Sequence, residues 1–138
     1  MRKMTENSSE PCPCGGGETY SLCCGPLHHG TVRAQTAEQL MRSRYSAYVL
    51  KLIDYLYQTT HPDKRTGQLH AEIAAWAEQV EFVRLEILSS QQGQEADKVG
   101  KVEFIAHFWQ QQQSGQLYER SRFRRYKGNW VYFDGEVR

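Results

Sequence analysis

The sequence predicts an α+β domain in which an antiparallel sheet curls over N-terminal helices, with a short cysteine-rich segment before it. Apolar residues recur at helical spacing in the first half of the chain and alternate with polar residues in the second half. Helices followed by successive hairpin-connected strands are typical of the α+β class. All four cysteines lie in one stretch near the start, "CPCGGGETYSLCC".

The chain has 138 residues and a formal net charge of +1. This length suits one packed domain with a small appendage, and the charge favours neither nucleic acid nor an acidic substrate. The opening "MRKMTENSSEP" lacks the apolar core of a signal peptide. No apolar run approaches the roughly 18 residues that span a bilayer, so we expect no transmembrane segment and a cytoplasmic location.

Three parts are expected along the chain. Residues 1–10 lack periodicity and predict a flexible arm. Residues 11–30 are rich in Gly, Cys and Pro and carry too few large apolar groups to fold by burial alone. Residues 31–138 carry the periodic patterns and predict the α+β domain.

The first predicted helix begins at Thr36, because Thr36 and Gln39 match a capping box. Apolar residues then follow at helical spacing: Leu40, Met41, Tyr45, Tyr48, Val49, Leu52, Ile53 and Leu56. They indicate one long helix or two helices bent near Leu50. His61-Pro62 ends this part, since the residue before proline avoids helical geometry. A further amphipathic helix is expected over 69–80.

Four alternating runs then predict strands at 83–87, 102–108, 117–126 and 130–134. In the first run, Val83, Leu85 and Ile87 are expected on one face. A polar loop follows it. We expect turns at Ser114-Gly115 and Gly128-Asn129, which give a curved sheet of about four strands.

The cysteine spacing predicts a metal site. Two short pairs, joined by a loop that folds back, supply the four tetrahedral ligands that zinc takes: Cys12, Cys14, Cys23 and Cys24. The glycines at 15–17 allow a tight turn after the first pair, and residues 18–22 are expected to form one helical turn. Four thiolates leave no open coordination position, so we expect one structural Zn²⁺ and no catalytic metal.

Other interpretations of the cysteines stay open. In a reducing compartment grouped thiols are more often ligands than disulfides, although redox chemistry or free thiols also fit the composition. His28 and His29 are close enough in sequence to replace one cysteine. Exposed loop positions are the expectation for both histidines, since four thiolates complete the shell.

The stretch "CPCGGGETYSLCCG" resembles the SEC-C motif, the zinc knuckle at the C-terminus of the preprotein translocase ATPase SecA and in other bacterial proteins. Residues shared with the motif pattern are Cys12, Pro13, Cys14, Gly15, Gly17, Tyr20, Cys23, Cys24 and Gly25. The sequence departs from the pattern at Gly16, where serine is common. Metal ligation does not need that hydroxyl.

The wider chain resembles the YchJ family of uncharacterised bacterial proteins. The matching stretches are "QLMRSRYSAYV", "HP", "ERSRF" and "WVYFDG", in order along the chain. The resemblance implies a SEC-C motif followed by a nuclear-transport-factor-two-like, or cystatin-like, cone of sheet and helices. Some members carry a second SEC-C motif at the C-terminus, which this chain lacks, and the family brings no established activity.

A curled sheet can enclose a cavity for a small ligand. Polar groups expected near it are Arg42, Arg44, Tyr45, His61, Glu119, Ser121, Arg122, Tyr132 and Asp134, with Arg42, His61, Glu119, Ser121 and Asp134 as the leading candidates. Strand alternation places Glu119 and Ser121 on the inner face. An acid–base site is one interpretation, but we favour an ion pair between Glu119 and Arg42 or Arg44, because structural ion pairs often resemble sites.

The stretch Arg120–Lys127 concentrates positive charge with interleaved aromatic residues. Such a pattern is found on surfaces that bind RNA or the ribosome. It is also found on the solvated outer face of a strand, and the near-neutral charge of the chain favours this second interpretation.

The sequence therefore indicates a zinc-binding interaction or adaptor module whose knuckle docks on a protein or ribonucleoprotein partner. The alternative is a small-ligand-binding protein or enzyme that uses the cavity. No residue is assigned a catalytic role, and the sequence does not indicate the oligomeric state.

Overall fold

The computed structural model describes residues 9–138, so most of the arm expected at residues 1–10 lies outside the described residues. The helices are α1 (Cys24–His28), α2 (Ala37–Leu50), α3 (Ile53–Gln58) and α4 (Leu69–Gln79), with 3-10 turns at Tyr20–Leu22 and Pro62–Lys64. The strands are β1 (Glu81–Gln92), β2 (Val99–Gln110), β3 (Gln113–Tyr126) and β4 (Asn129–Val137).

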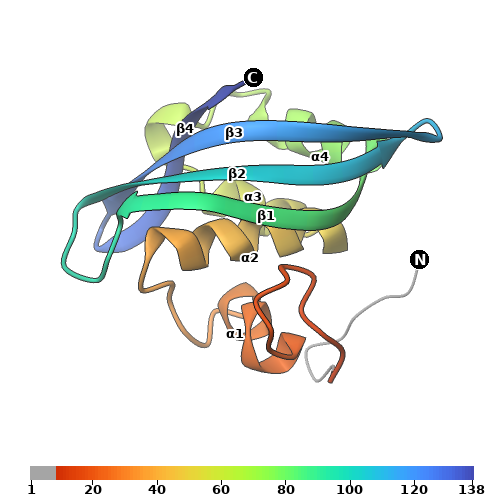
Figure 1. Cartoon of the computed structure of the whole chain (residues 1–138). Coiled ribbons are helices and arrows are strands. Elements are labelled where there is room, and N and C mark those ends of the chain that lie inside the picture. The colour runs from red at the N-terminus through yellow and green to blue at the C-terminus, as the bar shows by residue number, and fades with distance from the viewer. Residues whose placement is uncertain (1–8) are drawn as a thin grey trace.

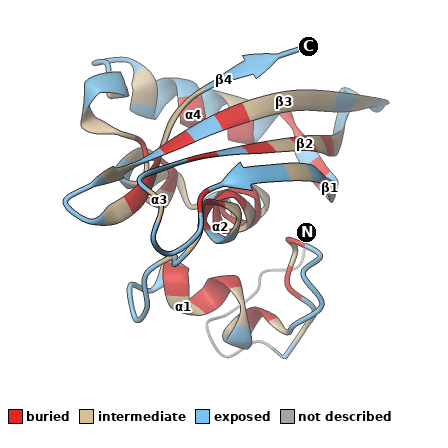
Figure 2. Cartoon of the chain, turned by 60° about the vertical axis from the view of Figure 1, so that its left-hand side comes forward, coloured by how far each residue is buried: buried red, intermediate tan, exposed pale blue. Residues whose placement is uncertain are grey.

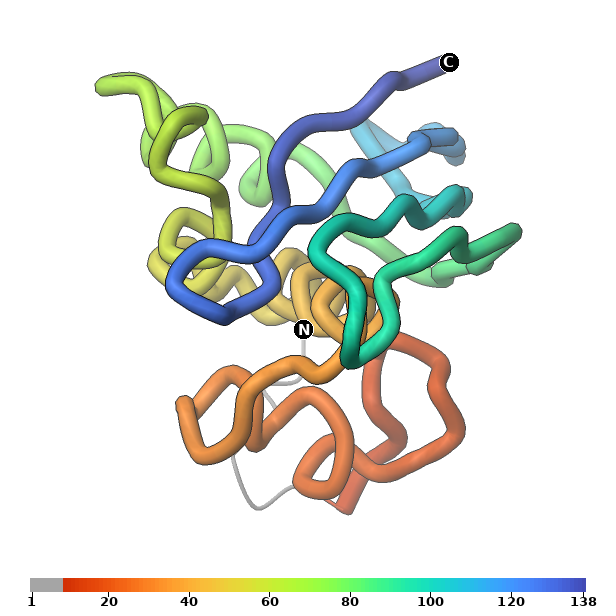
Figure 3. Tube along the Cα trace, turned by 90° about the vertical axis from the view of Figure 1, so that its left-hand side faces the viewer, coloured from red at the N-terminus to blue at the C-terminus, as the bar shows by residue number. Residues whose placement is uncertain are grey.

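The four strands form one antiparallel sheet in the order β1-β2-β3-β4. Helix α2 lies against the sheet, and the cysteine-rich segment lies on the opposite side of α2 (Figures 1 and 3). The prediction of an α+β fold with a four-stranded curved sheet is confirmed.

Helix α2 begins as predicted, because the Thr36 hydroxyl accepts a hydrogen bond from the Gln39 amide at 3.1 Å. It ends at Leu50, and the left-handed backbone of the next residue, Lys51 (φ 58°), separates α2 from α3. The structure thus has two helices with a break near Leu50. Since α2 is covered on both sides, polar residues in its middle, such as Ser43 and Ser46, are fully buried (Figure 2).

Two predicted turns are displaced by one to three residues. The β2–β3 turn is made by Gln111 and Gln112, with φ of 51° and 65°, and Ser114-Gly115 belongs to β3. Gly115 is needed for packing, because a Cβ there would lie 2.7 Å from the Phe108 ring. The β3–β4 turn is Lys127-Gly128, so the predicted Gly128-Asn129 turn is one residue late.

Two irregularities in β1 change which residues face the helices. The register shifts between Phe82 and Arg84 and again between Ile87 and Ser89. Each bulge reverses the alternation of side chains. Val83 is therefore 53% exposed, against the prediction that it shares the inner face with Leu85 and Ile87.

Phe82 takes the inward position at this end of β1 and is the centre of an aromatic cluster. Its ring centroid lies 5.7–6.2 Å from those of four other rings, belonging to Tyr45, Tyr48, Trp76 and Phe108. These side chains fasten α2 and α4 to the sheet. Among the described helices, none has the length and apolar character needed to cross a bilayer.

Candidate metal centre and inner cavity

The four cysteines converge although two pairs of them are separated by a loop. One sulfur atom from each of Cys12, Cys14, Cys23 and Cys24 lies within 4.8 Å of the others. The Sγ atoms of Cys14 and Cys23 are 3.6 Å apart, and those of Cys23 and Cys24 are 4.0 Å apart. All four are free thiols, and Cys23 alone among them is not buried.

These separations fit a tetrahedral zinc site. Zn–S bonds of about 2.3 Å place neighbouring sulfurs about 3.8 Å apart in a tetrahedron. Soft thiolate ligands in this geometry select zinc or an iron–sulfur centre over hard cations. The residues present could therefore hold one metal ion with no coordination position left open.

The pKa shifts of the thiols also favour a cation among the four sulfurs. Hydrogen bonds from Cys14 and Cys24 lower the pKa of Cys12, and the bond to Cys12 raises the pKa of Cys24. Burial raises the pKa of Cys23 to about 12. The cluster by itself thus favours the thiolate at Cys12 and disfavours it at Cys23 and Cys24, so ionisation of these three sulfurs together requires a positive charge among them.

Backbone geometry brings the two cysteine pairs together. Gly15 and Gly17 have φ of 74° and 97°, which L side chains rarely adopt, and they reverse the chain after Cys14. The amide of Cys12 donates to the Glu18 carbonyl at 2.9 Å, closing the loop. The predicted helical turn follows at Tyr20–Leu22 and delivers Cys23 and Cys24.

Position 16, where the SEC-C pattern commonly has serine, lies against the sulfurs. A Cβ at Gly16 would be 3.3 Å from Cys14 Sγ and 3.8 Å from Cys23 Sγ. With glycine at this position, no side chain lies between the backbone and the cysteine sulfurs.

Helix α2 holds the cysteine-rich segment from the other side. The Ser46 hydroxyl donates to Cys24 Sγ at 3.3 Å and lies 3.6 Å from Cys12 Sγ. Arg42 Nη1 donates to the Cys14 carbonyl at 2.9 Å, and its Nε pairs with Glu38. Sequence reasoning missed Ser46, because nothing in its local pattern separates it from an ordinary helix serine.

His28 also joins the segment to α2, which corrects its expected place in an exposed loop. Its Nε2 donates to the Ser43 carbonyl at 2.8 Å, so its Nδ1 accepts from the Tyr20 hydroxyl at 2.7 Å. Burial lowers the pKa of His28 and raises that of Tyr20 to about 12, so both stay neutral in this pair. His28 therefore has a packing role, and His29 is exposed.

The five leading cavity candidates lie in four different places. Glu119 and Ser121 line an inner cavity of about 130 Å³ between α2 and the sheet. Arg42 lies at the cysteine cluster. His61 packs against Tyr126 and Phe133.

Asp134 is the remaining candidate and lies on the outer face of the sheet. It pairs with Arg122 through two hydrogen bonds of 2.5 Å. These bonds lower the pKa of Asp134 and raise that of Arg122. The acid–base combination of His61 with Glu119 or Asp134 is not assembled.

The expected ion pair between Glu119 and Arg42 or Arg44 is not formed in the described part of the chain. Glu119 Oε2 accepts hydrogen bonds from Ser121 at 2.6 Å and from the Tyr132 hydroxyl at 3.0 Å. Arg44 lines the same cavity but donates to neutral acceptors at the end of α3. Helical and strand periodicity indicate the faces of these residues but not the direction of a long side chain.

The basic stretch Arg120–Lys127 is largely engaged within the chain. Arg120 and Arg122 pair with Glu103 and Asp134. Arg125 donates to backbone carbonyls of the β1–β2 loop. Arg124 stacks on the Phe133 ring at 3.7 Å.

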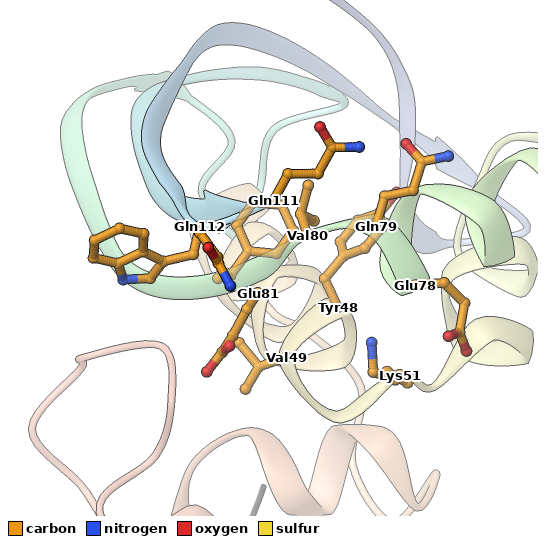
Figure 4. Close-up of a pocket in the computed structure, with 11 residues that line it drawn as sticks. Tyr48, Val49, Lys51, Glu78, Gln79, Val80, Glu81, Gln111 and Gln112 are labelled. Atoms are coloured by element: carbon orange, nitrogen blue, oxygen red, sulfur yellow. The ribbon is translucent and has the colours of Figure 1, made fainter.

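An open cleft of about 670 Å³ adjoins the inner cavity (Figure 4). Lys51 and Glu78 lie on one side of Tyr48 in this view, and Glu81 and Gln112 lie on the other. The cleft and the cavity share Tyr48 and Phe82. Glutamines of the β2–β3 turn therefore form part of a rim, which the sequence did not indicate.

Comparisons with known proteins agree with this architecture. A family model described as "YchJ, middle NTF2-like domain" matches residues 36–135. A UPF0225 protein of Bordetella pertussis is 43% identical over 98% of this chain and 100% of its own length. A UPF0225 protein of Streptomyces coelicolor is 44% identical over 91% of this chain and 94% of its own length.

Two solved structures are similar. A SEC-C motif containing protein from Rhodopseudomonas palustris has a TM-score of 0.83 and 42% identity, covering 92% of this chain and 98% of its own. A SEC-C motif containing protein from Psychrobacter arcticus has a TM-score of 0.77 and 30% identity, covering 97% of this chain and 86% of its own.

Proposed function

The chain belongs to the YchJ (UPF0225) family, and we propose that one structural zinc ion shapes its N-terminal segment into a docking surface for a protein partner. The observation that carries the proposal is the convergence of four cysteine sulfurs within 4.8 Å. The solved SEC-C motif containing proteins that resemble this chain support the assignment of the motif.

When bound, the ion would cross-link Cys12, Cys14, Cys23 and Cys24 and compensate the charge of their thiolates. Ser46 would donate to the Cys24 sulfur, which disperses negative charge on it. A closed four-sulfur site supports a structural role, because a substrate would find no coordination position.

Leu22 is the side chain that we propose as the apolar anchor. It is 73% exposed, the most exposed large apolar side chain among the described residues. It ends the 3-10 turn whose first residue, Tyr20, is buried, and it directly precedes the ligand Cys23. The buried Tyr20 before Leu22 and the ligand Cys23 after it hold the turn in place. Leu22 is therefore presented at low entropic cost, which favours its insertion into a partner's pocket.

A protein partner fits better than RNA. The guanidinium groups of Arg120, Arg122 and Arg125 already have acceptors within the chain, which leaves them little capacity for phosphates. The formal net charge of +1 likewise gives weak general attraction to nucleic acid.

Affinity capture from a bacterial lysate tests the docking surface. We expect Leu22→Asp to reduce capture of the partner at least tenfold, since a desolvated apolar anchor is worth about 2 kcal/mol or more. Leu88→Asp is the matched control, because Leu88 is also exposed (48%) but lies on β1. Zinc content and thermal stability of both variants are measured in parallel.

Chelation of zinc from the wild-type protein is expected to abolish the same capture, and zinc added back restores it. Equal capture by the wild-type protein and the Leu22→Asp variant, with zinc retained in both, would refute Leu22 as the anchor. Capture that survives full zinc removal would refute the role of the knuckle.

A further inference from the structure

The inner cavity is lined by two groups of opposite charge, Arg44 and Glu119, that form no ion pair with each other. Its lining combines two kinds of residue from the helices and the sheet. The apolar ones are Met41, Trp76, Phe82, Phe104, Ala106 and Leu117, and those with polar groups are Arg44, Tyr45, Tyr48, Glu119, Ser121 and Tyr132. Apolar walls with a few convergent polar groups are the usual composition of a small-molecule site.

Arg44 is the most unusual of these groups, because it is a cation with only 7% of its surface exposed. Its Nη1 donates to the Leu56 carbonyl at 2.8 Å and to Thr59 Oγ1 at 2.7 Å. Its Nε and Nη2 donate to no described residue, and it forms no ion pair with any of them. A buried charge is normally paired, but this guanidinium has no carboxylate of the described residues within ion-pair distance, although Glu119 lines the same cavity.

The remaining contacts of Arg44 fix its position. Its guanidinium carbon lies 4.7 Å from the centre of the Tyr132 ring. Tyr132 is held by backbone hydrogen bonds to the chain that follows α3, from its own amide to Thr59 and from the His61 amide to its carbonyl. Arg44 is thus pre-organised against an aromatic face, which lowers the entropic cost of binding an anion.

Glu119 offers the complementary group. Both of its hydrogen bonds, from Ser121 and Tyr132, reach Oε2, and no described residue donates to Oε1. Burial raises the pKa of Tyr132, which therefore remains a proton donor to Glu119. The free oxygen can accept a hydrogen bond from a ligand hydroxyl.

We propose that the inner cavity binds a small hydroxylated organic acid, whose carboxylate pairs with Arg44 and whose hydroxyl donates to Glu119. A cavity of about 150 Å³ holds a benzene ring, and this cavity is slightly smaller at about 130 Å³, so the body of the ligand is no larger than one six-membered ring. The adjoining cleft gives a way in past Tyr48 and Phe82, which line both spaces. This site is separate from the metal centre and does not depend on the docking proposal.

The test is an NMR titration of the wild-type protein with 4-hydroxybenzoate as the probe. Phenol lacks the carboxylate, and benzoate lacks the hydroxyl. We expect phenol to bind at least tenfold more weakly, because it forms no charge-assisted hydrogen bonds with Arg44. Benzoate is expected to bind at least threefold more weakly, since it leaves Glu119 without a donor.

Amide shifts should change at the cavity wall formed by two neighbouring strands, at Ala106 of β2 and at Ser121 of β3. No saturable shift with 4-hydroxybenzoate would refute the site. Equal affinity for phenol would refute the role of Arg44, and equal affinity for benzoate would refute the role of Glu119.

A steric variant gives an independent measure of location. Ala106 is 2% exposed and lines the cavity. Ala106→Leu should therefore fill part of the cavity and weaken the binding of 4-hydroxybenzoate at least tenfold. Ala75→Leu on the exposed part of α4 is the control and should bind as the wild type does. Full affinity in a folded Ala106→Leu variant would contradict the site, and if that variant does not fold, the ligand series on the wild-type protein decides.

Discussion

Replacing Cys23 and Cys24 together by serine is expected to release the zinc ion and to lower the free energy of unfolding by about 4 kcal/mol. Without its metal the segment 11–30 lacks the means to stay folded. Tyr20 and Leu27, now 3% and 6% exposed, would then lose their packing. Each buried side chain of this kind contributes about 1.5–3 kcal/mol.

Urea unfolding and zinc analysis of the purified variant measure this effect. In NMR spectra the signals of 11–30 should collapse to narrow dispersion, while signals of β1–β4 persist, because we propose residues 31–138 as a separate folding unit. Ser21→Ala, in the same turn, is the control and should keep both zinc and stability. A variant that retains zinc would contradict the ligand assignment, and loss of the sheet signals would contradict the proposed division.

Gly93→Ala is expected to lower the free energy of unfolding by about 3 kcal/mol. Two effects add at this position. Its φ of +76° is strained for alanine, and a Cβ would lie 2.7 Å from the Cβ of Ala37. Gly93 also accepts the Ala37 amide at 2.8 Å, so the loop after β1 is fastened to the first turn of α2 and has little room to move.

Gly128→Ala separates these two effects. Gly128 has a similar φ of +84°, but nothing lies within 4 Å of a Cβ built there. We expect Gly128→Ala to lower the free energy of unfolding by only about 1–2 kcal/mol, because only the strain of the left-handed backbone contributes. Denaturant midpoints of the two variants give the comparison, and equal losses would show that the approach of Gly93 to α2 does not constrain the fold.

Features encoded within a few residues were predictable. Thr36 and Gln39 specify the start of α2 through a hydrogen bond three residues apart. The spacing of Cys12-x-Cys14 and Cys23-Cys24 predicts that the four sulfurs come together, and in the structure they lie within 4.8 Å of one another. Strand alternation likewise placed Glu119 and Ser121 on the inner face, where both line the cavity.

Features that depend on contacts between residues far apart in the sequence were not predictable. The sequence predicts a turn at Gly115, but in the structure this glycine is in a strand and packs against the Phe108 ring. Val83 faces outward because a bulge interrupts the alternation, and a bulge has no reliable local signal. Arg44 turns to carbonyl and hydroxyl groups at the end of α3 instead of to Glu119, and that choice is made by tertiary packing.

X-ray absorption spectroscopy at the zinc edge is the most direct test of the central claim. Protein purified under reducing conditions is predicted to contain one zinc per chain, with four sulfur ligands at about 2.3 Å. A protein that is folded over residues 11–30 but free of metal would contradict the claim. A zinc shell containing nitrogen or oxygen in place of any of the four sulfurs would contradict it as well.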